Sequence, residues 1–302
     1  MASTRDYSVF GLTVRSELDL PELFPAEHSG DPDVVVRIAT LAEPERAPGL
    51  TGQGDTLLLT IPKVARYFIR AGREILVEPE AAVPERNVRL YLLGSAFGAL
   101  LHQRGLLPLH ANAVEIDGKA VAFMGESGAG KSTLATWFHD RGFRVIADDV
   151  CVVQFGHDGE VRACPGLPRL RLGQEVLEAT GRRASAFHPS YLGDEQFKKY
   201  DVSIDTKAAR RSIEVGAAFI LGKADAFSVE RLSGVDGANA VFDNTYRGEY
   251  LDRVDGHQGH WSAAIALVRK VPIYRLSRIR DIARLDEQCE LILQWVRDFA
   301  LS

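Results

Sequence analysis

Residues 119–133 read KAVAFMGESGAGKST, and the rest of the chain is best understood from this stretch. Residues 120–124 form an apolar run that predicts a buried strand, and residues 133–139 predict a helix. Between them, residues 125–132 fit the pattern G-x-x-x-x-G-K-[ST]. A strand, a glycine-rich loop and a helix in this order are the context of a phosphate-binding P-loop. The motif predicts binding of a nucleoside triphosphate and leaves the use of that nucleotide open.

The residue types in the loop explain why it should bind phosphate. Its three glycines tolerate positive φ, so the backbone can curl with its N–H groups pointing inward. The helix that follows adds the positive end of its dipole. Lys131 should reach the β- and γ-phosphates, and the Ser132 hydroxyl should bind Mg²⁺. The alternative is a glycine-rich turn before an ordinary helix. The expected nucleotide contacts are Gly125, Glu126, Ser127, Gly128, Ala129, Gly130, Lys131, Ser132 and Thr133.

An acidic pair, Asp148-Asp149, stands between the apolar segments 143–147 and 150–154, which we interpret as one continuing strand. Carboxylates are costly to bury among apolar residues without a cation. A Walker-B aspartate needs this placement, beside the P-loop, to bind Mg²⁺. The alternative is a solvated loop. Adjacent strand residues point to opposite faces, so both carboxylates can reach one site only if the strand ends or bends there.

The chain before the P-loop divides into two parts. Residues 7–90 read as β-rich, with a hairpin across Pro62-Lys63. Residues 88–104 predict a buried helix that ends at Gly105. Residues 107–116 then alternate as a strand, and the turn Asp117-Gly118 joins them to the P-loop strand. The P-loop strand should therefore have an antiparallel neighbour, unlike that of the common GTPase and ATPase folds.

Several basic residues follow the acidic pair. Arg169 and Arg171 would share one face of an extended segment, where the alternative is a solvent-facing pair. Residues 197–200 (FKKY) could contact phosphate or form plain surface, and the arginines of residues 278–284 are interpreted as a solvated helix face. Residues 213–221, 229–232 and 271–276 predict strands. Residues 238–246 and 262–268 predict helices, and the three-and-four spacing of apolar residues over 282–299 predicts an amphipathic C-terminal helix.

Bulk properties exclude several classes of protein. The net charge of −5 argues against a general nucleic-acid binder. The three cysteines, Cys151, Cys164 and Cys289, lack metal-ligand spacing and are expected to be buried thiols in a reducing compartment. The N-terminus has no apolar signal-peptide region, and no stretch approaches ~18 uninterrupted apolar residues. We therefore expect a cytoplasmic protein that is not inserted in a membrane.

Taken together, His110, the segment GESGAGKST (125–133) and the segment RGFRVIADD (141–149) resemble the HPr kinase/phosphorylase family. The closer likeness is to HPr-kinase-related proteins of bacterial peptide-modification clusters, including lasso-peptide kinases. Three further segments fit that subgroup, namely FGLTVRSELDLPEL (10–23), LLPLHANAV (106–114) and PGLPRLRL (165–172). The clear match covers about residues 88–175.

The resemblance implies an α/β fold with a P-loop kinase core related to phosphoenolpyruvate carboxykinase. It implies a β-rich N-terminal unit at residues 1–84, a kinase domain at residues 85–302, and a serine kinase that uses ATP and Mg²⁺. In the family the first aspartate accepts the hydroxyl proton, the second helps to bind Mg²⁺ and the histidine hydrogen-bonds nearby. The corresponding residues of this chain are Asp148, Asp149 and His110. The sequence does not fix which aspartate accepts the proton and which binds Mg²⁺. Lys131 completes the catalytic set, and Arg169 and Arg171 would contact phosphates or acceptor.

One signature of the family is missing. HPr kinases carry a glutamate-x-arginine pair after the acidic residues, where this chain has Arg169-Leu170-Arg171. The resemblance therefore leaves open both the reverse phosphorylase activity and HPr as substrate. The family's hexamer is not implied, although a homo-oligomer stays open. The expected acceptor is a peptide or protein, for instance a ribosomal precursor peptide. The alternatives are a nucleotide-binding regulatory module and a kinase of a small-molecule hydroxyl.

Overall fold

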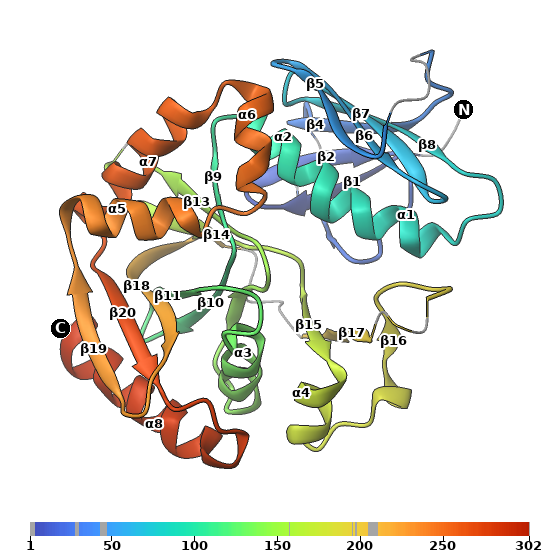
Figure 1. The fold of residues 1–302 in the computed structure, drawn as a ribbon. Coiled ribbons are helices and arrows are strands. Elements are labelled where there is room, and N and C mark those ends of the chain that lie inside the picture. The colour runs from blue at the N-terminus through green and yellow to red at the C-terminus, as the bar shows by residue number, and fades with distance from the viewer. Residues whose placement is uncertain are drawn as a thin grey trace. The chain divides into compact units, whose positions relative to one another are not determined.

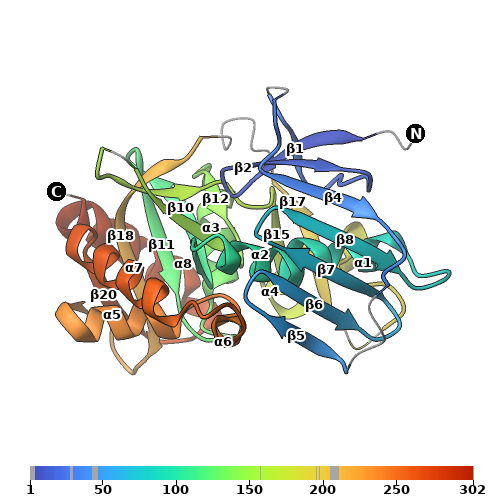
Figure 2. The ribbon, with the colours of Figure 1, turned by 90° about the horizontal axis from the view of Figure 1, so that it is seen from above.

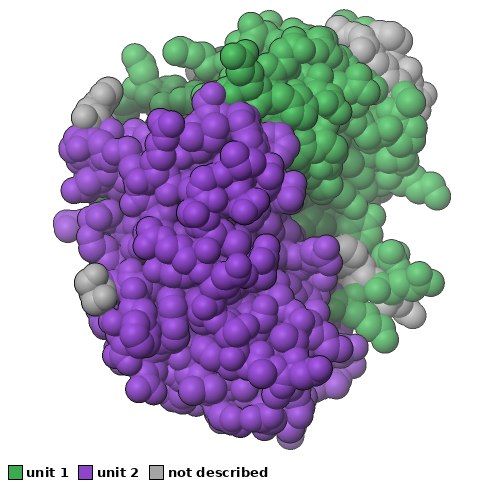
Figure 3. All heavy atoms as spheres, turned by 60° about the vertical axis from the view of Figure 1, so that its left-hand side comes forward, with its two compact units in different colours: residues 1–106, 189–198, 247–260 green, residues 107–188, 199–246, 261–302 purple. Residues whose placement is uncertain are grey.

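The computed structural model describes residues 4–27, 30–42, 47–156, 158–194, 196, 198–204 and 211–301. The chain forms two compact units, which Figure 3 colours separately. Unit 1 comprises residues 1–106, 189–198 and 247–260, and unit 2 comprises residues 107–188, 199–246 and 261–302. Unit 1 thus extends past the boundary expected near residue 84 and takes in two later segments of the chain.

Unit 1 is built on an eight-stranded sheet with the order β3-β1-β2-β4-β8-β7-β6-β5. The hairpin expected across Pro62-Lys63 is confirmed, because Ile61 pairs with Ala65 and Lys63 adopts a φ of 62° in the turn. The strands are β1 (Arg5–Val9), β2 (Leu12–Ser16), β3 (Phe24–Pro25), β4 (Val34–Ile38), β5 (Gly49–Gln53), β6 (Thr56–Ile61), β7 (Ala65–Arg70) and β8 (Glu74–Pro79). The β-rich character predicted for this part of the chain is confirmed.

A long helical segment packs on this sheet (Figures 1 and 2). It consists of α1 (Glu85–Tyr91), the π-helical turn η1 (Leu92–Ala96) and α2 (Phe97–Gln103), and both η1 and α2 contact β7. Gly105 follows with a φ of 66° and donates its N–H to the His102 carbonyl, which ends the helix as predicted. Residues 247–260, a later segment of unit 1, contain η3 (Gly248–Tyr250) and α6 (Leu251–Val254).

Unit 2 is built on a nine-stranded sheet with the order β12-β10-β11-β18-β14-β13-β9, to which β20 adds beside β18 and β19 beside β20. The predicted hairpin is confirmed, because β10 pairs antiparallel with β11 across Asp117 (φ 48°) and Gly118 (φ 81°). On its other side β11 runs parallel to β18. The strands are β9 (Leu107–Leu109), β10 (Ala111–Ile116), β11 (Lys119–Met124), β12 (Val145–Ala147), β13 (Cys151–Phe155), β14 (Val161–Cys164), β18 (Ile213–Lys223), β19 (Ser228–Leu232) and β20 (Ile273–Arg278).

Both faces of β11 are buried, which explains its uninterrupted apolar run. Val121 and Phe123 belong to a core shared with α3 (Lys131–Asp140) and α8 (Leu285–Trp295). Ala120, Ala122 and Met124 belong to a second core, shared with α5 (Gly234–Asp243) and the part of α7 (His257–Lys270) that lies in unit 2. The alternation follows from the two-residue period of a strand. β11 ends at Met124, and the glycine-rich loop begins at the next residue.

The prediction that one strand runs through the acidic pair is wrong. β12 ends at Ala147 and pairs with β10, whereas β13 starts at Cys151 and pairs with β9 and β14. Asp149 has a φ of 72°, in the left-handed region, so the chain turns sharply there. Asp148 and Asp149 therefore lie on the connection between two strands.

The remaining elements follow the acidic pair. β15 (Arg169–Gly173) and β17 (Lys199–Ser203) pair antiparallel in a three-stranded sheet that includes β16 (His188–Pro189). The short helices α4 (Gln174–Ala179) and η2 (Ala184–Ala186) follow β15, and η4 (Ile282–Arg284) and η5 (Val296–Ala300) flank α8. The three cysteines are buried free thiols. None of the described helices is both long and apolar enough to cross a membrane.

Candidate functional site

The glycine loop, residues 125–130, connects β11 to the N-terminus of α3. All three glycines use the conformational freedom expected of them, with φ values of 142° at Gly125, 80° at Gly128 and 92° at Gly130. The Lys131 Nζ lies under the loop and donates to the carbonyls of Gly125 at 2.5 Å and Glu126 at 3.1 Å. Burial lowers the Lys131 pKa, while Asp149 and Asp148 raise it. The curled loop and the nearby carboxylates are therefore compatible with a charged lysine facing an anion.

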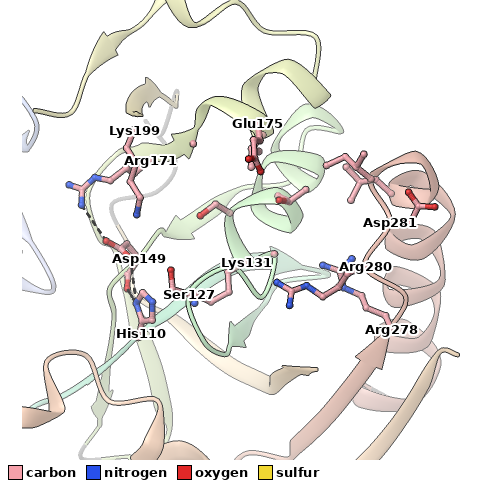
Figure 4. Close-up of a pocket in the computed structure, with 18 residues that line it drawn as sticks. His110, Ser127, Lys131, Asp149, Arg171, Glu175, Lys199, Arg278, Arg280 and Asp281 are labelled. Atoms are coloured by element: carbon pink, nitrogen blue, oxygen red, sulfur yellow. Dashed lines mark hydrogen bonds and ion pairs between the residues drawn. The ribbon is translucent and has the colours of Figure 1, made fainter. Parts of the chain in front are cut away.

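A cavity of about 470 Å³ opens over the glycine loop (Figure 4). Five lysine and arginine side chains line it but only three carboxylates, so its walls favour a polyanion. The lining residues are His110, Ser127, Gly128, Gly130, Lys131, Ser132, Thr133, Asp149, Arg171, Gly173, Glu175, Val176, Lys199, Arg278, Arg280, Asp281, Ile282 and Leu285. Of the loop residues expected to contact nucleotide, Gly125, Glu126 and Ala129 are not in this lining.

The cavity has two chemically different ends. Figure 4 shows Asp149 and His110 on one side of Lys131, with Arg278 and Asp281 on the other. We call the first side the reaction end. The second side, which we call the apolar end, includes Ile282, the residue after Asp281. The other apolar residues of the cavity lining are Val176 and Leu285. Apolar side chains next to the charged ones suit a ligand that carries both phosphates and a ring.

Asp149 is the carboxylate of the reaction end. Its two oxygens lie 3.3 Å from an Arg171 Nη and 3.4 Å from the His110 Nδ1. Burial alone would raise the Asp149 pKa, but Arg171, His110, Lys199 and Lys131 together hold that pKa below its usual value. Asp149 is therefore ionised at neutral pH, as a metal ligand must be.

His110 lies between strands β9 and β10 and faces the same end of the cavity. Its Nδ1 is 3.0 Å from the backbone oxygen of Asp149, a geometry in which the protonated Nδ1 donates to that carbonyl. Burial lowers the His110 pKa, and the Lys131 charge lowers it further. The imidazole is therefore neutral near pH 7. Among the described residues its Nε2 has no hydrogen-bond partner, so that nitrogen can accept a proton.

Asp148 is held away from the cavity. It is 4% exposed, and its oxygens accept hydrogen bonds from the Asn112 Nδ2 at 2.8 Å and the Arg171 N–H at 2.6 Å. Burial, helped by the charge of Asp149, raises the Asp148 pKa to about 7. These contacts make Asp148 a positioning residue that ties β15 and β10 to the acidic turn, and its role as proton acceptor stays a prediction. Sequence reasoning missed Asn112, although an asparagine in the apolar strand 107–116 is a visible signal.

Arg169 and Arg171 share a face of β15 but have different surroundings. Arg171 lines the cavity beside Asp149, whereas Arg169 does not line it and pairs with Asp201 at 2.8 Å. The side chains of Arg169 and Asp201 are 11% and 10% exposed, so the solvent-facing alternative is wrong. The structure thus brings only one of the two arginines to the site.

This difference predicts that substitution of Arg171 lowers the reaction rate, whereas substitution of Arg169 lowers the stability of the fold. Arg171→Ala should cut any phosphotransfer by roughly 10²-fold, because a charge-stabilising donor is lost from the site. Arg169→Ala should instead lower the free energy of unfolding in urea by about 3 kcal/mol, because Asp201 loses a buried partner. Arg162→Ala, which breaks an exposed pair with Asp158, is the matched control and should cost under about 1 kcal/mol. Equal kinetics for the Arg169 and Arg171 variants would contradict the assignment.

Several lining residues were not expected to lie at the site. Arg278 is the clearest correction: it was interpreted as part of a solvated helix face, yet it ends β20 and is 4% exposed. The strand runs two residues further than the apolar pattern indicated. Lys199 lines the cavity too, in keeping with the phosphate-contact alternative given for residues 197–200, whereas Phe197 of that segment lies outside the described residues. Glu175, Arg280 and Asp281 carried no signal that separates them from ordinary surface residues.

The site offers two oxygen ligands for Mg²⁺, the Ser132 hydroxyl and the Asp149 carboxylate, which line the same cavity. No cluster of three His, Cys, Asp or Glu side chains able to hold a metal occurs among the described residues. Mg²⁺ at phosphate sites usually takes one or two protein ligands and completes its shell with phosphates and water. The residues present therefore fit a metal that arrives with a nucleotide.

Comparison with known proteins adds little to this geometry. No protein-family model matches the chain, and no curated protein does. Among solved structures, the Hpr(Ser) kinase/phosphatase from Coxiella burnetii is 15% identical over 63% of this chain and 94% of its own, with a TM-score of 0.33. A likeness at this level carries no argument about fold or reaction. The chain is a mixed α/β protein with several sheets.

Proposed function

We propose that this chain is an ATP- and Mg²⁺-dependent kinase that transfers the γ-phosphate to a hydroxyl group, specifically a serine of a peptide or protein. The observation that carries this proposal is the reaction end of the cavity. There an ionised carboxylate, Asp149, and a neutral imidazole, His110, face the same space as Lys131 and the glycine loop. A regulatory nucleotide switch would need the loop and the lysine but not a proton acceptor opposite them.

The cavity suggests how the donor lies. Its phosphates bind the N–H groups of the glycine loop and the start of α3, with Lys131 as the central cation. The nucleoside extends toward the apolar end, where Ile282 is 56% exposed and available to cover a ring. This orientation directs the γ-phosphate toward Asp149 and His110.

The reaction needs a hydroxyl oxygen to attack the γ-phosphorus while the bond to the ADP oxygen breaks and the hydroxyl proton leaves. The His110 Nε2 accepts that proton, and its Nδ1–H holds the ring against the Asp149 backbone. Asp149 and Ser132 would hold Mg²⁺, which supplies charge neutralisation on the phosphates when bound. Lys131, Arg171 and Lys199 stabilise the charge that develops on the transferred group.

The serine acceptor rests on the sequence resemblance. The test is therefore a transfer assay with purified protein, Mg²⁺ and γ-labelled ATP against serine peptides, matched alanine peptides and small hydroxylated metabolites. We expect label on serine peptides alone. Label on a metabolite would identify a small-molecule kinase. ATP binding with label released only to water, or not at all, would favour the regulatory module and contradict the proposal.

The pH dependence of transfer tests His110. Because the His110 pKa lies below its usual 6.5, transfer should rise with pH through an apparent pKa below 6.5 and then level off. His110→Gln should remove this rise and lower the plateau by roughly 10²–10⁴-fold. His188→Gln, an exposed histidine outside the cavity, is the matched control and should leave the profile unchanged. A profile of His110→Gln that keeps the rise would exclude His110 as the proton acceptor.

A further inference from the structure

The guanidinium of Arg278 lies against the glycine loop. Arg278 is the last residue of β20, is 4% exposed and lines the cavity. One of its Nη atoms is 2.6 Å from the position that a Cβ on Gly130 would occupy. A side chain at residue 130 would therefore collide with Arg278. The absence of a side chain there lets the guanidinium reach the loop.

Among the described residues, no carboxylate balances this buried charge. Among the described residues Arg278 makes no ion pair, and its Nε has no hydrogen-bond partner. The titratable groups that influence it most are the Cys289 thiol and a second cation, Arg280, and burial lowers the Arg278 pKa. Arg169 and Arg171, by contrast, each have an aspartate partner. A buried cation without a partner destabilises a protein, so an anion bound beside it removes that cost.

The position of Arg278 restricts which anion this is. Figure 4 shows Arg278 and Asp149 on opposite sides of Lys131. A group on the far side of the lysine from the reaction end faces the part of a nucleotide that is not transferred. We propose that Arg278, with the amides around Gly130, forms a subsite for the non-transferred phosphates of a nucleoside di- or triphosphate. This inference rests on the proposed nucleotide chemistry and extends it to a residue that no sequence motif identifies.

Two other roles for Arg278 make different predictions. If Arg278 only held the glycine loop in shape, its removal would destabilise the protein without a ligand. If it stabilised the transferred phosphoryl group, its removal would lower kcat and leave ADP affinity intact. A diphosphate subsite requires that ADP and ATP lose affinity by similar factors, and that the ligand-free protein gains stability when the unpaired charge is removed.

The experiment compares Arg278→Met, which keeps the apolar stem, with Arg278→Lys, which keeps a charge but loses the planar fork. Calorimetry gives the affinities for ADP, ATP and inorganic pyrophosphate, and thermal unfolding gives Tm with and without ADP. For Arg278→Met we expect ADP and ATP affinities roughly 10- to 100-fold weaker, a higher Tm without ligand and a smaller Tm rise with ADP. The ADP affinity of Arg278→Lys should lie between that of Arg278→Met and that of the unsubstituted protein.

The matched control is Arg275→Met, an exposed position on the same strand whose side chain pairs with Glu230. It should leave ADP affinity unchanged. Normal ADP affinity in Arg278→Met would overturn the proposal, as would a loss confined to kcat. If Arg278→Met fails to fold, Arg278→Lys provides the test. Unchanged affinity of Arg278→Lys for ADP and pyrophosphate would overturn the proposed subsite. These measurements need no acceptor, so a failure to detect phosphotransfer would contradict the proposed kinase without affecting this result.

Discussion

Lys131→Ala should abolish detectable phosphotransfer, with a loss of at least roughly 10³-fold. Lys131 is the cation at the centre of the cavity, 6% exposed and held in place by the carbonyls of Gly125 and Glu126. Its removal leaves the donor phosphates without their central positive charge, so ATP affinity should fall as well. Steady-state transfer rates and calorimetric ADP binding measure the two effects separately.

The control for this variant is Lys119→Ala. Lys119 begins the same strand, β11, but its side chain is 40% exposed and pairs with Glu214. The substitution should leave transfer within about twofold of the unsubstituted protein, because exposed ion pairs contribute little. Transfer by Lys131→Ala within tenfold of the unsubstituted rate would contradict the P-loop assignment. Circular dichroism shows whether the variant is folded.

Asp149→Asn should be nearly as damaging and should raise the Mg²⁺ concentration needed for half-maximal transfer. The amide keeps the shape of the side chain but removes the one carboxylate that the described residues place at the reaction end. Arg171 and His110 would then lose the anion they contact at 3.3 and 3.4 Å. We expect a rate loss of roughly 10²–10⁴-fold, most of it at low Mg²⁺. A Mg²⁺ titration of transfer rate is the measurement.

Asp148→Asn provides the contrast within the same acidic pair. Both oxygens of Asp148 already accept hydrogen bonds, from Asn112 and from the Arg171 N–H. An amide in this place faces one of those donors with its own N–H₂, which should cost about 1–3 kcal/mol of stability. The Mg²⁺ requirement should not move. If Asp148→Asn shifts the Mg²⁺ requirement and Asp149→Asn does not, Asp148 and not Asp149 binds Mg²⁺.

The local features of the site were predictable because short stretches of sequence encode them. The glycines at 125, 128 and 130 permit the positive φ values that the loop adopts, and Asp117-Gly118 supplies the turn of the hairpin. The apolar run of β11 predicted a buried strand, and the two cores confirm it and show that both faces are buried. Each of these conclusions depends on residues within a few positions of one another.

The acidic pair shows where local reasoning fails. The apolar residues on either side of it are compatible with one strand, and the acidic pair itself left a continuing strand, a bend and a solvated loop open. The break arises because β12 and β13 find different partners in the sheet, β10 for one and β9 and β14 for the other. Pairing partners distant in sequence thus decided that Asp149 faces the cavity while Asp148 is buried.

The sequence by itself determined that a glycine-rich loop of the P-loop pattern follows a buried strand, that the neighbouring strand is antiparallel, and that an acidic pair stands beside them. Only the tertiary structure decided which charged groups meet there. His110 and Asp149 are 39 residues apart in the chain, and Arg278 reaches Gly130 only because β20 lies beside β18 in the sheet that carries the loop. The physical reason is that backbone conformation follows from local sterics, whereas the partner of a charge is set by how distant strands pair and which side chains that pairing buries.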